Sequence, residues 1–355
     1  MKALFIYRFL TRGGVEAVLA TRLRGLKKWG IDAQAWFLFD GPGRSLFRGV
    51  LDQVHIGSTK ALSHYMESKR FAIISILDTP EVFPVLNQMP HAPKFILEVH
   101  SPYSENLHYL KSLRMRRMDA LFVPSQFQAS VVQSRLRKKV AIRVVPNPVG
   151  EAFVGQLSNF SPMPERPIVA WLGRLDRLKN WTEFIAIAGQ LTAAGSMAQY
   201  WMLGRGSEEK VAGKLVRLAQ RQGILDSLRW FRGVDQEHIP RVLDAVRTSG
   251  GVVVSTSKGD SFGMTIAEAM ARGCAVVVPA EGPFREFVTS GEHGFDYPLG
   301  DAAQAAQQIK QLLEKEPLRR SLGENGRTSI VARHGPQVAL GVLAGELKKV
   351  YTGAE

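Results

Sequence analysis

The chain has 355 residues, of which 45% are hydrophobic and 22% charged, with 33 Gly and 18 Pro. At roughly 150 residues per domain this length predicts two domains, and the composition excludes both collagen-like structure and disorder. The single cysteine, Cys274, rules out an internal disulfide. Together with the lack of any zinc-ligand spacing, this indicates a reducing compartment and no resident metal.

The formal net charge of +14 is unevenly distributed. Residues 1–150 hold 22 basic and 10 acidic residues, whereas the rest of the chain holds 24 and 22. Such an excess attracts anionic partners, and a phospholipid surface or a phosphorylated acceptor fits it. Nucleic acid is not expected, because no recognition motif accompanies the charge, and a solvated basic face without a partner stays open. The basic runs are Arg114, Arg116 and Arg117, and Arg135, Arg137, Lys138 and Lys139.

The first apolar run, between Lys2 and Arg8, is far shorter than the roughly 20 residues of a membrane span and too short for a signal sequence. It is typical of a buried strand instead. No other run approaches a membrane span, so we expect a cytoplasmic protein with at most peripheral contact at the inner face of a membrane.

Short apolar runs then alternate with amphipathic stretches along the first half, which predicts a series of strands and helices. The expected strands are 3–7, 33–39, 72–77, 94–100, 120–125 and 141–147. Residues 149–167 contain several prolines and small polar residues, which indicates a linker. A second series follows, with strands at 167–173, 198–204, 228–233, 251–255 and 274–279.

Strands that are apolar throughout are typical of parallel sheets covered on both faces. The fold class predicted is therefore α/β, with two doubly wound units facing each other across a cleft and ligands at the carboxyl ends of the strands. We place the domains at residues 1–155 and 166–333. Residues 334–355 form a C-terminal helix that we expect to pack back on the first domain.

The loop at residues 11–16 follows the first strand and contains Gly13 and Gly14. Paired glycines let a phosphate approach the backbone, and the N–H groups at the start of a helix bind anions. A tight turn of purely structural purpose is an equal alternative here. The pattern is not G-x-G-x-x-G, which argues against a dinucleotide cofactor and an oxidoreductase.

The loop after the first strand of the second series holds Arg174 and Lys179. Two cations at the carboxyl end of a strand can stabilise a departing nucleoside diphosphate where no metal does so; surface solvation is the alternative. Farther along, Asp260 lies in a glycine-containing loop and Glu268 about one turn into the helix that follows, ending near Gly273. One carboxylate can bind ribose hydroxyls and the other a sugar, unless they form a structural ion pair.

In their order along the chain these segments resemble family 4 of the retaining nucleotide-sugar glycosyltransferases, also called group 1, which have the GT-B fold of two Rossmann-like domains. The resemblance covers nearly the whole chain. It rests on the ordered set GGVE, VPS, VVPNPV, GRLDRLKN, LGRGSE, the D-x7-E segment with EAMARG, and GEHGF. Each motif alone is weak, and only their order is specific.

The resemblance implies a role for each matching residue. Gly13 and Gly14 would lie against the donor phosphates, and Arg174 and Lys179 would bind the diphosphate. Asp260 would face the transferred sugar. The other residues implied are His100, over the sugar and the scissile bond; Phe262, Gly263 and Met264, through their backbone amides at the phosphates; Glu268, at the ribose; and Arg205, Gly233 and Val234, near the nucleobase.

The family usually has Glu where this chain has Asp260, one methylene shorter, which leaves the donor sugar open. The activity implied is transfer of a sugar from a nucleoside diphosphate sugar to an acceptor hydroxyl, without a metal cofactor and with retention. The acceptor is expected to be anionic or lipid-linked. Two alternatives stay open: a nucleotide-sugar epimerase of the same fold and a non-catalytic nucleotide-sugar-binding protein. The base, the sugar, the acceptor and the oligomeric state are not determined.

Overall fold

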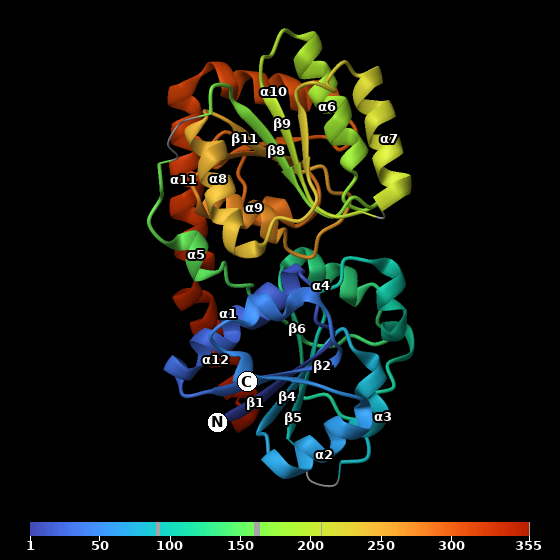
Figure 1. Ribbon diagram of the computed structural model, residues 1–355. Helices are drawn as coiled ribbons and strands as arrows, with labels where there is room; N and C mark the ends of the chain where they lie inside the picture. Colours follow the sequence, from blue (N-terminus) through green and yellow to red (C-terminus); the bar gives the residue numbers. More distant parts are fainter. Residues whose placement is uncertain (90–92, 160–163, 207, 355) are drawn as a thin grey trace. The chain divides into compact units, whose positions relative to one another are not determined.

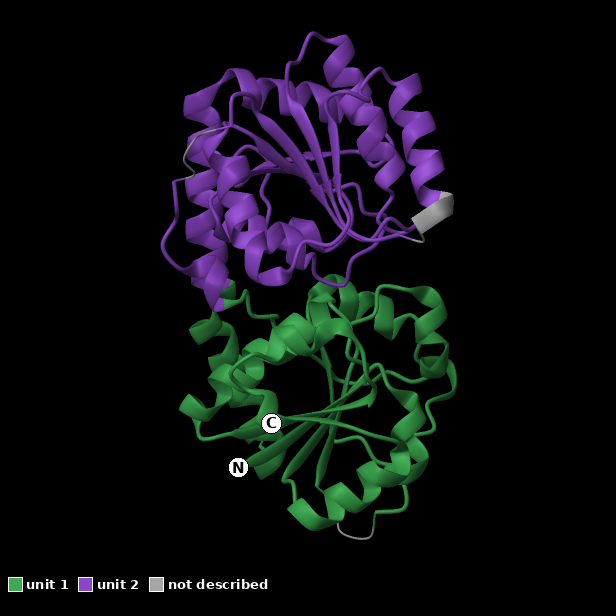
Figure 2. Ribbon diagram, in the orientation of Figure 1, with its two compact units in different colours: residues 1–150, 334–355 green, residues 151–333 purple. Residues whose placement is uncertain are grey.

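In the computed structural model, which describes residues 1–89, 93–159, 164–206 and 208–354, the chain divides into two compact units (Figure 2). Unit 1 comprises residues 1–150 and 334–355, and unit 2 comprises residues 151–333. Both are α/β units with an entirely parallel sheet, and the predicted fold class is confirmed. None of the helices in the described part of the chain is long and apolar enough to cross a membrane.

Unit 1 has a seven-stranded sheet in the order β3-β2-β1-β4-β5-β6-β7. Every strand pair is parallel, and β1 and β2 are in register along their whole length, from Lys2 opposite Asp32 to Phe9 opposite Phe39. The strands are β1 (Lys2–Phe9), β2 (Asp32–Phe39), β3 (Val54–Ile56), β4 (Ile73–Leu77), β5 (Lys94–Glu98), β6 (Ala120–Val123) and β7 (Ile142–Val144).

Helices cover both faces of this sheet, which explains why its central strands are apolar throughout. Figure 1 shows α1 (Gly14–Gly25) and α12 (Pro336–Thr352) on one side, and α2 (Thr59–Lys69) and α3 (Phe83–Leu86) on the other. Alternate residues of β1 serve the two faces, since Phe5 packs with α1 and Leu4 with α2. Between β6 and β7 lies α4 (Gln126–Gln133).

The C-terminal helix α12 packs on unit 1, against α1. The two helices approach closely at Gly25, where a Cβ atom would lie 2.2 Å from Leu340 Cδ1. Arg143 Nη1 also forms an ion pair with Glu346 Oε2 at 3.0 Å. The return of the last helix thus completes the core of the first unit.

Unit 2 has a six-stranded parallel sheet in the order β10-β9-β8-β11-β12-β13. Its core contains α6, α7 and α10 on one face, whereas α8 and α9 contact the sheet on the other. The strands are β8 (Ile168–Leu172), β9 (Gln199–Leu203), β10 (Leu228–Phe231), β11 (Val252–Val254), β12 (Ala275–Pro279) and β13 (Phe295–Tyr297). The helices are α5 (Glu151–Val154), α6 (Trp181–Ala193), α7 (Glu208–Arg221), α8 (Ile239–Thr248), α9 (Met264–Ala271), α10 (Ala302–Glu314) and α11 (Glu316–His334).

The boundary between the units falls after Gly150, five residues before the position expected from the sequence. The reason is that α5 is held by arginines of unit 2. Arg272, whose Nε donates to Asp244 Oδ1 at 3.0 Å, also donates from Nη1 to the Ala152 carbonyl at 3.4 Å. The expected linker therefore belongs to unit 2 from Glu151 onward.

Candidate functional site

A pocket lies at the carboxyl end of β8 and β11 in unit 2. Ligands of open parallel α/β sheets bind at this end of the strands. Lys179 and Asp260, which the sequence singled out from separate loops, both line it. The further lining residues are Trp171, Leu172, Val254, Ser255, Ser257, Gly263, Thr265, Ile266 and Phe284.

Lys179 and Asp260 form an ion pair between Nζ and Oδ1, and both side chains are mostly buried. The loops that carry them are also joined directly, because Lys258 N donates to the Leu178 carbonyl at 2.8 Å. In the protein alone the cation and the carboxylate therefore neutralise each other. A diphosphate that binds Lys179 has to compete with Asp260 for its ammonium group.

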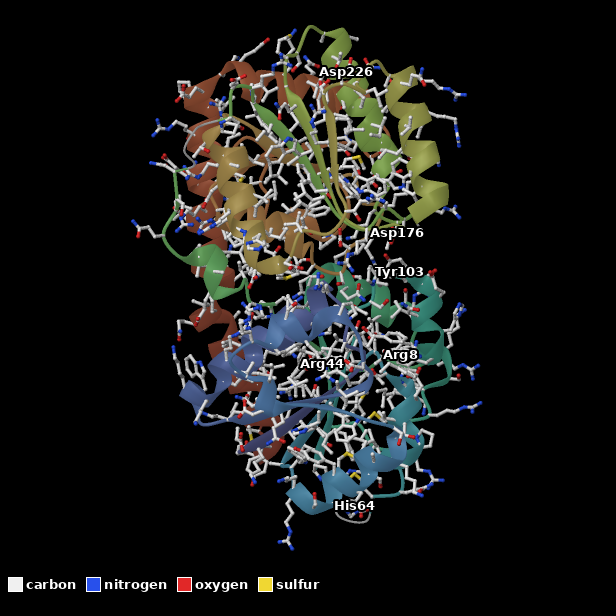
Figure 3. All side chains as sticks on the ribbon, viewed as in Figure 1. Arg8, Arg44, His64, Tyr103, Asp176 and Asp226 are labelled. Carbon is white, nitrogen blue, oxygen red and sulfur yellow. The ribbon has the colours of Figure 1, made fainter. Side chains whose placement is uncertain are left out.

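Arg174 lies in the same loop as Lys179 but outside this pair. Its side chain is 64% exposed, and its Nε is 3.5 Å from Oδ2 of Asp176, a residue of the loop after β8 that Figure 3 labels. Asp176 also accepts a hydrogen bond from Lys179 N, at 2.9 Å, through Oδ1. Of the two predicted cations, Lys179 is therefore mostly buried and Arg174 is exposed, and both lie next to Asp176.

The helix α9 begins at the pocket. Its N-cap is Gly263, with φ of 93°, and no side chain caps the helix. A Cβ atom at this position would lie 2.6 Å from Phe284 Cε1, so both the backbone conformation and the space require glycine. The ring of Phe262 is buried against Phe287, with ring centroids 5.4 Å apart, so the Phe262 side chain packs into the core beside the start of α9. Such an uncapped helix start binds anions.

Glu268 lies one turn into α9 and is buried. Its Oε1 accepts a hydrogen bond from Gln236 Nε2 at 3.1 Å, and Gln236 begins the 3-10 helix η6 (Gln236–His238). Burial raises the pKa of Glu268 to about 8, which the bond from Gln236 only partly opposes. Gln236 did not stand out in the sequence, because an amide in a loop between a strand and a helix carries no pattern of its own.

The residues expected near a nucleobase lie in the loops after β9 and β10. The Arg205 side chain lies against Gly233, where a Cβ atom would be 3.6 Å from Arg205 Nη2, and the Arg205 carbonyl accepts from Leu175 N at 2.8 Å. Val234, next along the chain, is half-buried. The structure therefore brings Arg205 and Gly233 together beside the loop of Arg174; Ser207, within the LGRGSE motif, lies outside the described residues.

In unit 1 the loop at residues 11–16 differs from a simple phosphate cradle. Gly13 is the N-cap of α1, but the buried carboxylate of Glu16 folds back to this position. Glu16 Oε1 accepts from Thr11 N at 2.8 Å and from the Thr11 hydroxyl, and a Cβ atom on Gly13 would lie 2.6 Å from Glu16 Oε2. A carboxylate thus stands where the sequence predicted a phosphate at Gly13 and Gly14, which favours the alternative of a structural turn.

His100 follows β5 and is buried. Its Nε2 is 2.9 Å from Glu98 Oε2, and its backbone N donates to Asp78 Oδ2 at 2.7 Å. The ring Nδ1 is buried without a hydrogen-bond partner among the described residues. The ring is therefore fixed through one nitrogen and leaves the other as its only unused polar atom.

Glu98 is the centre of this arrangement. Arg22 Nη1 lies 2.9 Å from both carboxylate oxygens, and Ser75 donates to Oε1 at 2.6 Å. Burial opposes ionisation, but the charge of Arg22 and the hydrogen bonds from His100 and Ser75 lower the pKa of Glu98 to about 2. Sequence reasoning missed these residues, although a charged residue within an apolar strand and an arginine on the buried face of a helix were available signals.

The basic runs predicted to attract an anionic partner lie at the other end of the sheet. Arg114, Arg116 and Arg117 come before β6, and the run at 135–139 comes before β7. In a parallel sheet, residues that precede strands lie at the amino edge, away from the carboxyl edge that binds ligands. Arg135 is also half-buried, whereas the other six are exposed. These residues therefore form a separate basic surface rather than the lining of an acceptor site.

Known proteins resemble the chain in sequence and in fold. Residues 158–329 match the family of glycosyl transferases group 1. The lipopolysaccharide core biosynthesis glycosyltransferase LpsE of Rhizobium meliloti is 30% identical over 203 residues, 56% of this chain and 56% of that protein. The phosphatidyl-myo-inositol mannosyltransferase of Mycobacterium leprae is 27% identical over 185 residues, 52% of this chain and 46% of that protein.

The aligned segment thus spans about half the length of these curated relatives. Among solved structures, Anabaena HepE in complex with UDP and glucose superimposes with a TM-score of 0.83, at 18% identity, over 98% of this chain and 100% of that one. At this identity the likeness concerns the fold, which is that of the GT-B glycosyltransferases.

Proposed function

We propose that this chain, whose residues 158–329 match the family of glycosyl transferases group 1, transfers a sugar from a nucleoside diphosphate sugar to an acceptor hydroxyl with retention at the anomeric carbon. The observation that carries the proposal is the pocket of unit 2. There a buried lysine, a carboxylate and an uncapped helix start meet at the carboxyl end of the sheet. HepE, which shares the fold, binds UDP and glucose.

The donor contacts are assigned by chemistry. Lys179 and Arg174 bind the diphosphate, and the first N–H groups of α9, at Phe262, Gly263 and Met264, add to this anion site. Glu268 accepts hydrogen bonds from the ribose. Arg205, with Gly233 and Val234, lies at the nucleobase. Because these groups supply the positive charge for the diphosphate, the proposal includes no resident metal, so turnover is expected to persist in EDTA.

Asp260 takes a second role once the donor is bound. When the diphosphate draws the Lys179 ammonium group away, the Asp260 carboxylate is released to accept hydrogen bonds from the transferred sugar. His100 is assigned to the same sugar, through its unused Nδ1. No side chain is assigned as a covalent nucleophile. The acceptor attacks from the face that the diphosphate leaves, and the diphosphate takes up the acceptor proton while Lys179 and the dipole of α9 stabilise its charge.

The acceptor is proposed to be anionic or presented at an anionic membrane. The exposed basic surface at the amino edge of unit 1 supports peripheral contact with an anionic membrane, whereas the acceptor itself would bind at the carboxyl edge. The proposal therefore includes a cytoplasmic location with reversible binding to the inner face of a membrane, since the apolar runs of the sequence are short.

A donor screen tests the proposal. Thermal unfolding is followed with UDP, GDP, ADP and dTDP sugars, and one of these is expected to raise the Tm, because a ligand at 100 times its Kd adds about 2.7 kcal/mol. The stabilising donor is then incubated with acceptor pools, and the anomeric configuration of the product is read by NMR. An isomer formed without any acceptor would indicate the epimerase. Binding without turnover on any pool would indicate the non-catalytic alternative.

A further inference from the structure

Two exposed aromatic side chains lie together at the ends of adjacent strands in unit 1. Phe9 ends β1 and is 43% exposed, and Phe39 ends β2 and is 53% exposed. The two residues are in register, and their rings stack with centroids 5.3 Å apart and planes inclined by 28°. Single exposed apolar residues are ordinary on a protein surface, but two stacked rings form a continuous apolar platform.

This platform occupies the carboxyl edge of the sheet. The main chain is well fixed there, since Leu10 N donates to the Phe39 carbonyl at 3.0 Å and Gly43 N donates to the Leu10 carbonyl at 3.0 Å. The sheet order places β5, which leads to His100, two strands from β1. At about 4.8 Å per strand this separation is about 10 Å, roughly the length of one sugar unit with its substituent.

A cation borders the platform. The Arg8 guanidinium carbon is 5.6 Å from the centroid of the Phe9 ring, and this group also forms an ion pair with Glu81. Arg8, labelled in Figure 3, belongs to β1, and its side chain is 34% exposed. An anionic substituent bound at the platform would compete with Glu81 for this guanidinium, whereas the basic surface lies at the other edge of the sheet.

We propose that Phe9, Phe39 and Arg8 form an acceptor subsite for a pyranose ring that carries an anionic substituent. Phe39 offers the face that is not stacked on Phe9 to the positively polarised C–H groups of the sugar. Phe9 supports the Phe39 ring, and Arg8 receives the anion. A lipid chain is a poorer occupant, because membrane-inserted aromatics project from amphipathic helices with basic flanks, whereas these two end paired strands. The subsite rests on the proposed function, since it names the acceptor for the same reaction.

The probes are glucose 6-phosphate and glucuronic acid, with methyl α-glucoside and inorganic phosphate as half-ligands. Binding is measured by calorimetry. The intact protein is expected to bind an anionic sugar more tightly than either half-ligand, and Phe39→Ala is expected to weaken this about 10-fold. Phe39→Tyr, which keeps the ring, retains affinity, and Arg8→Gln removes the preference for the anion. Leu51→Ala is the matched control, because Leu51 is 48% exposed in the same unit.

Three results would overturn the subsite. The first is that neither anionic sugar binds the intact protein. The second is that Phe39→Ala binds the anionic sugar as tightly as the intact protein does. The third is that Phe39→Ala loses vesicle binding while its sugar binding is unchanged, which would indicate a lipid contact. The donor-induced rise in Tm is measured in the same variants and is expected to be unchanged. If no nucleotide sugar stabilises the intact protein while glucose 6-phosphate still binds through Phe39, the proposed function fails, and these residues bind an anionic sugar that is not an acceptor.

Discussion

Two buried glutamates, Glu98 in unit 1 and Glu268 in unit 2, differ in how far their neighbours compensate the carboxylate charge. Glu98 receives an arginine, a serine and a histidine, and its pKa falls to about 2. Among the described residues, Glu268 receives a side-chain hydrogen bond from the amide of Gln236 alone, and its pKa rises to about 8. A buried carboxylate costs free energy unless it is compensated. Glu98 is therefore compensated by its neighbours in unit 1, whereas Glu268 in unit 2 stays largely uncompensated.

The largest effect is expected from breaking the complete network. Glu98→Ala leaves the Arg22 charge buried without a partner, which should lower the free energy of unfolding by about 3–5 kcal/mol. Denaturation by urea measures this loss. The double variant Arg22→Met with Glu98→Leu should recover most of it, because the uncompensated charge is gone. Asp40→Ala breaks the exposed pair with Arg44 and should lower the free energy of unfolding far less, because solvent screens this pair. A similar cost for Asp40→Ala and Glu98→Ala would refute the distinction.

The next effect concerns catalysis in unit 2. Lys179→Ala should lower turnover about 10²-fold or more, as expected when one donor to the leaving group is deleted. Arg174→Ala is expected to act in the same direction. Arg177→Ala is the control, because Arg177 is an exposed cation of the same loop. Lys179→Ala removes a cation and also leaves Asp260 without its ion-pair partner. Asp260→Asn breaks the same ion pair but keeps the lysine, so comparing the two variants isolates the effect of losing the cation. Near-normal rates in both Lys179→Ala and Arg174→Ala would remove the diphosphate assignment.

Glu268 should make stability depend on pH. Its native pKa of about 8 exceeds the ordinary value of 4.5, so the unfolded chain loses this proton first. The contribution to the free energy of unfolding is fully present below about pH 4.5 and is lost as the pH rises to about 8. The slope reaches at most about 1.4 kcal/mol per pH unit. Urea denaturation between pH 5 and 9 measures it, and Glu268→Gln should remove this component; an identical pH profile in that variant would contradict the assignment.

A donor should supply the partners that Glu268 lacks. Ribose hydroxyls bind a carboxylate more strongly than a neutral acid or amide, so Glu268→Gln should weaken donor binding about 10-fold. In the intact protein, donor affinity should also rise with pH towards 8, as the carboxylate forms. Calorimetry on both proteins at several pH values gives the two results together. An unchanged donor Kd in Glu268→Gln would count against contact with the ribose.

The same contrast explains what the sequence could predict. Fully apolar runs such as 72–77 identified the central strands, and the fold class was confirmed. The edge strands β3 and β13 were missed, because three residues with a histidine or an aspartate at the centre form no apolar run. Motif order found Glu268 and His100, but their environments depend on Gln236 and on Arg22, far away in the chain. Compensation of charge is a tertiary property, so spacing alone could not reveal it.

The smallest effect is expected at the basic surface on the amino edge of unit 1. Arg137, Lys138 and Lys139 are exposed there, and each basic residue near an anionic membrane contributes about 1 kcal/mol. Lys138→Glu should therefore weaken binding to phosphatidylserine vesicles several-fold, and reversal of all three charges should abolish it. Moderate salt should weaken binding of the intact protein, because this contribution is screened.

Lys60→Glu is the control for that experiment, because Lys60 is exposed but begins α2, which follows a strand and so lies at the carboxyl edge. Turnover on a soluble acceptor should be the same in all these variants, since the amino edge is remote from the acceptor subsite. Equal vesicle binding by the triple variant and the intact protein would refute the membrane assignment. Negligible binding by every protein at low salt would leave a soluble anionic acceptor, recognised at the carboxyl edge through Arg8, as the one form of the proposal that survives.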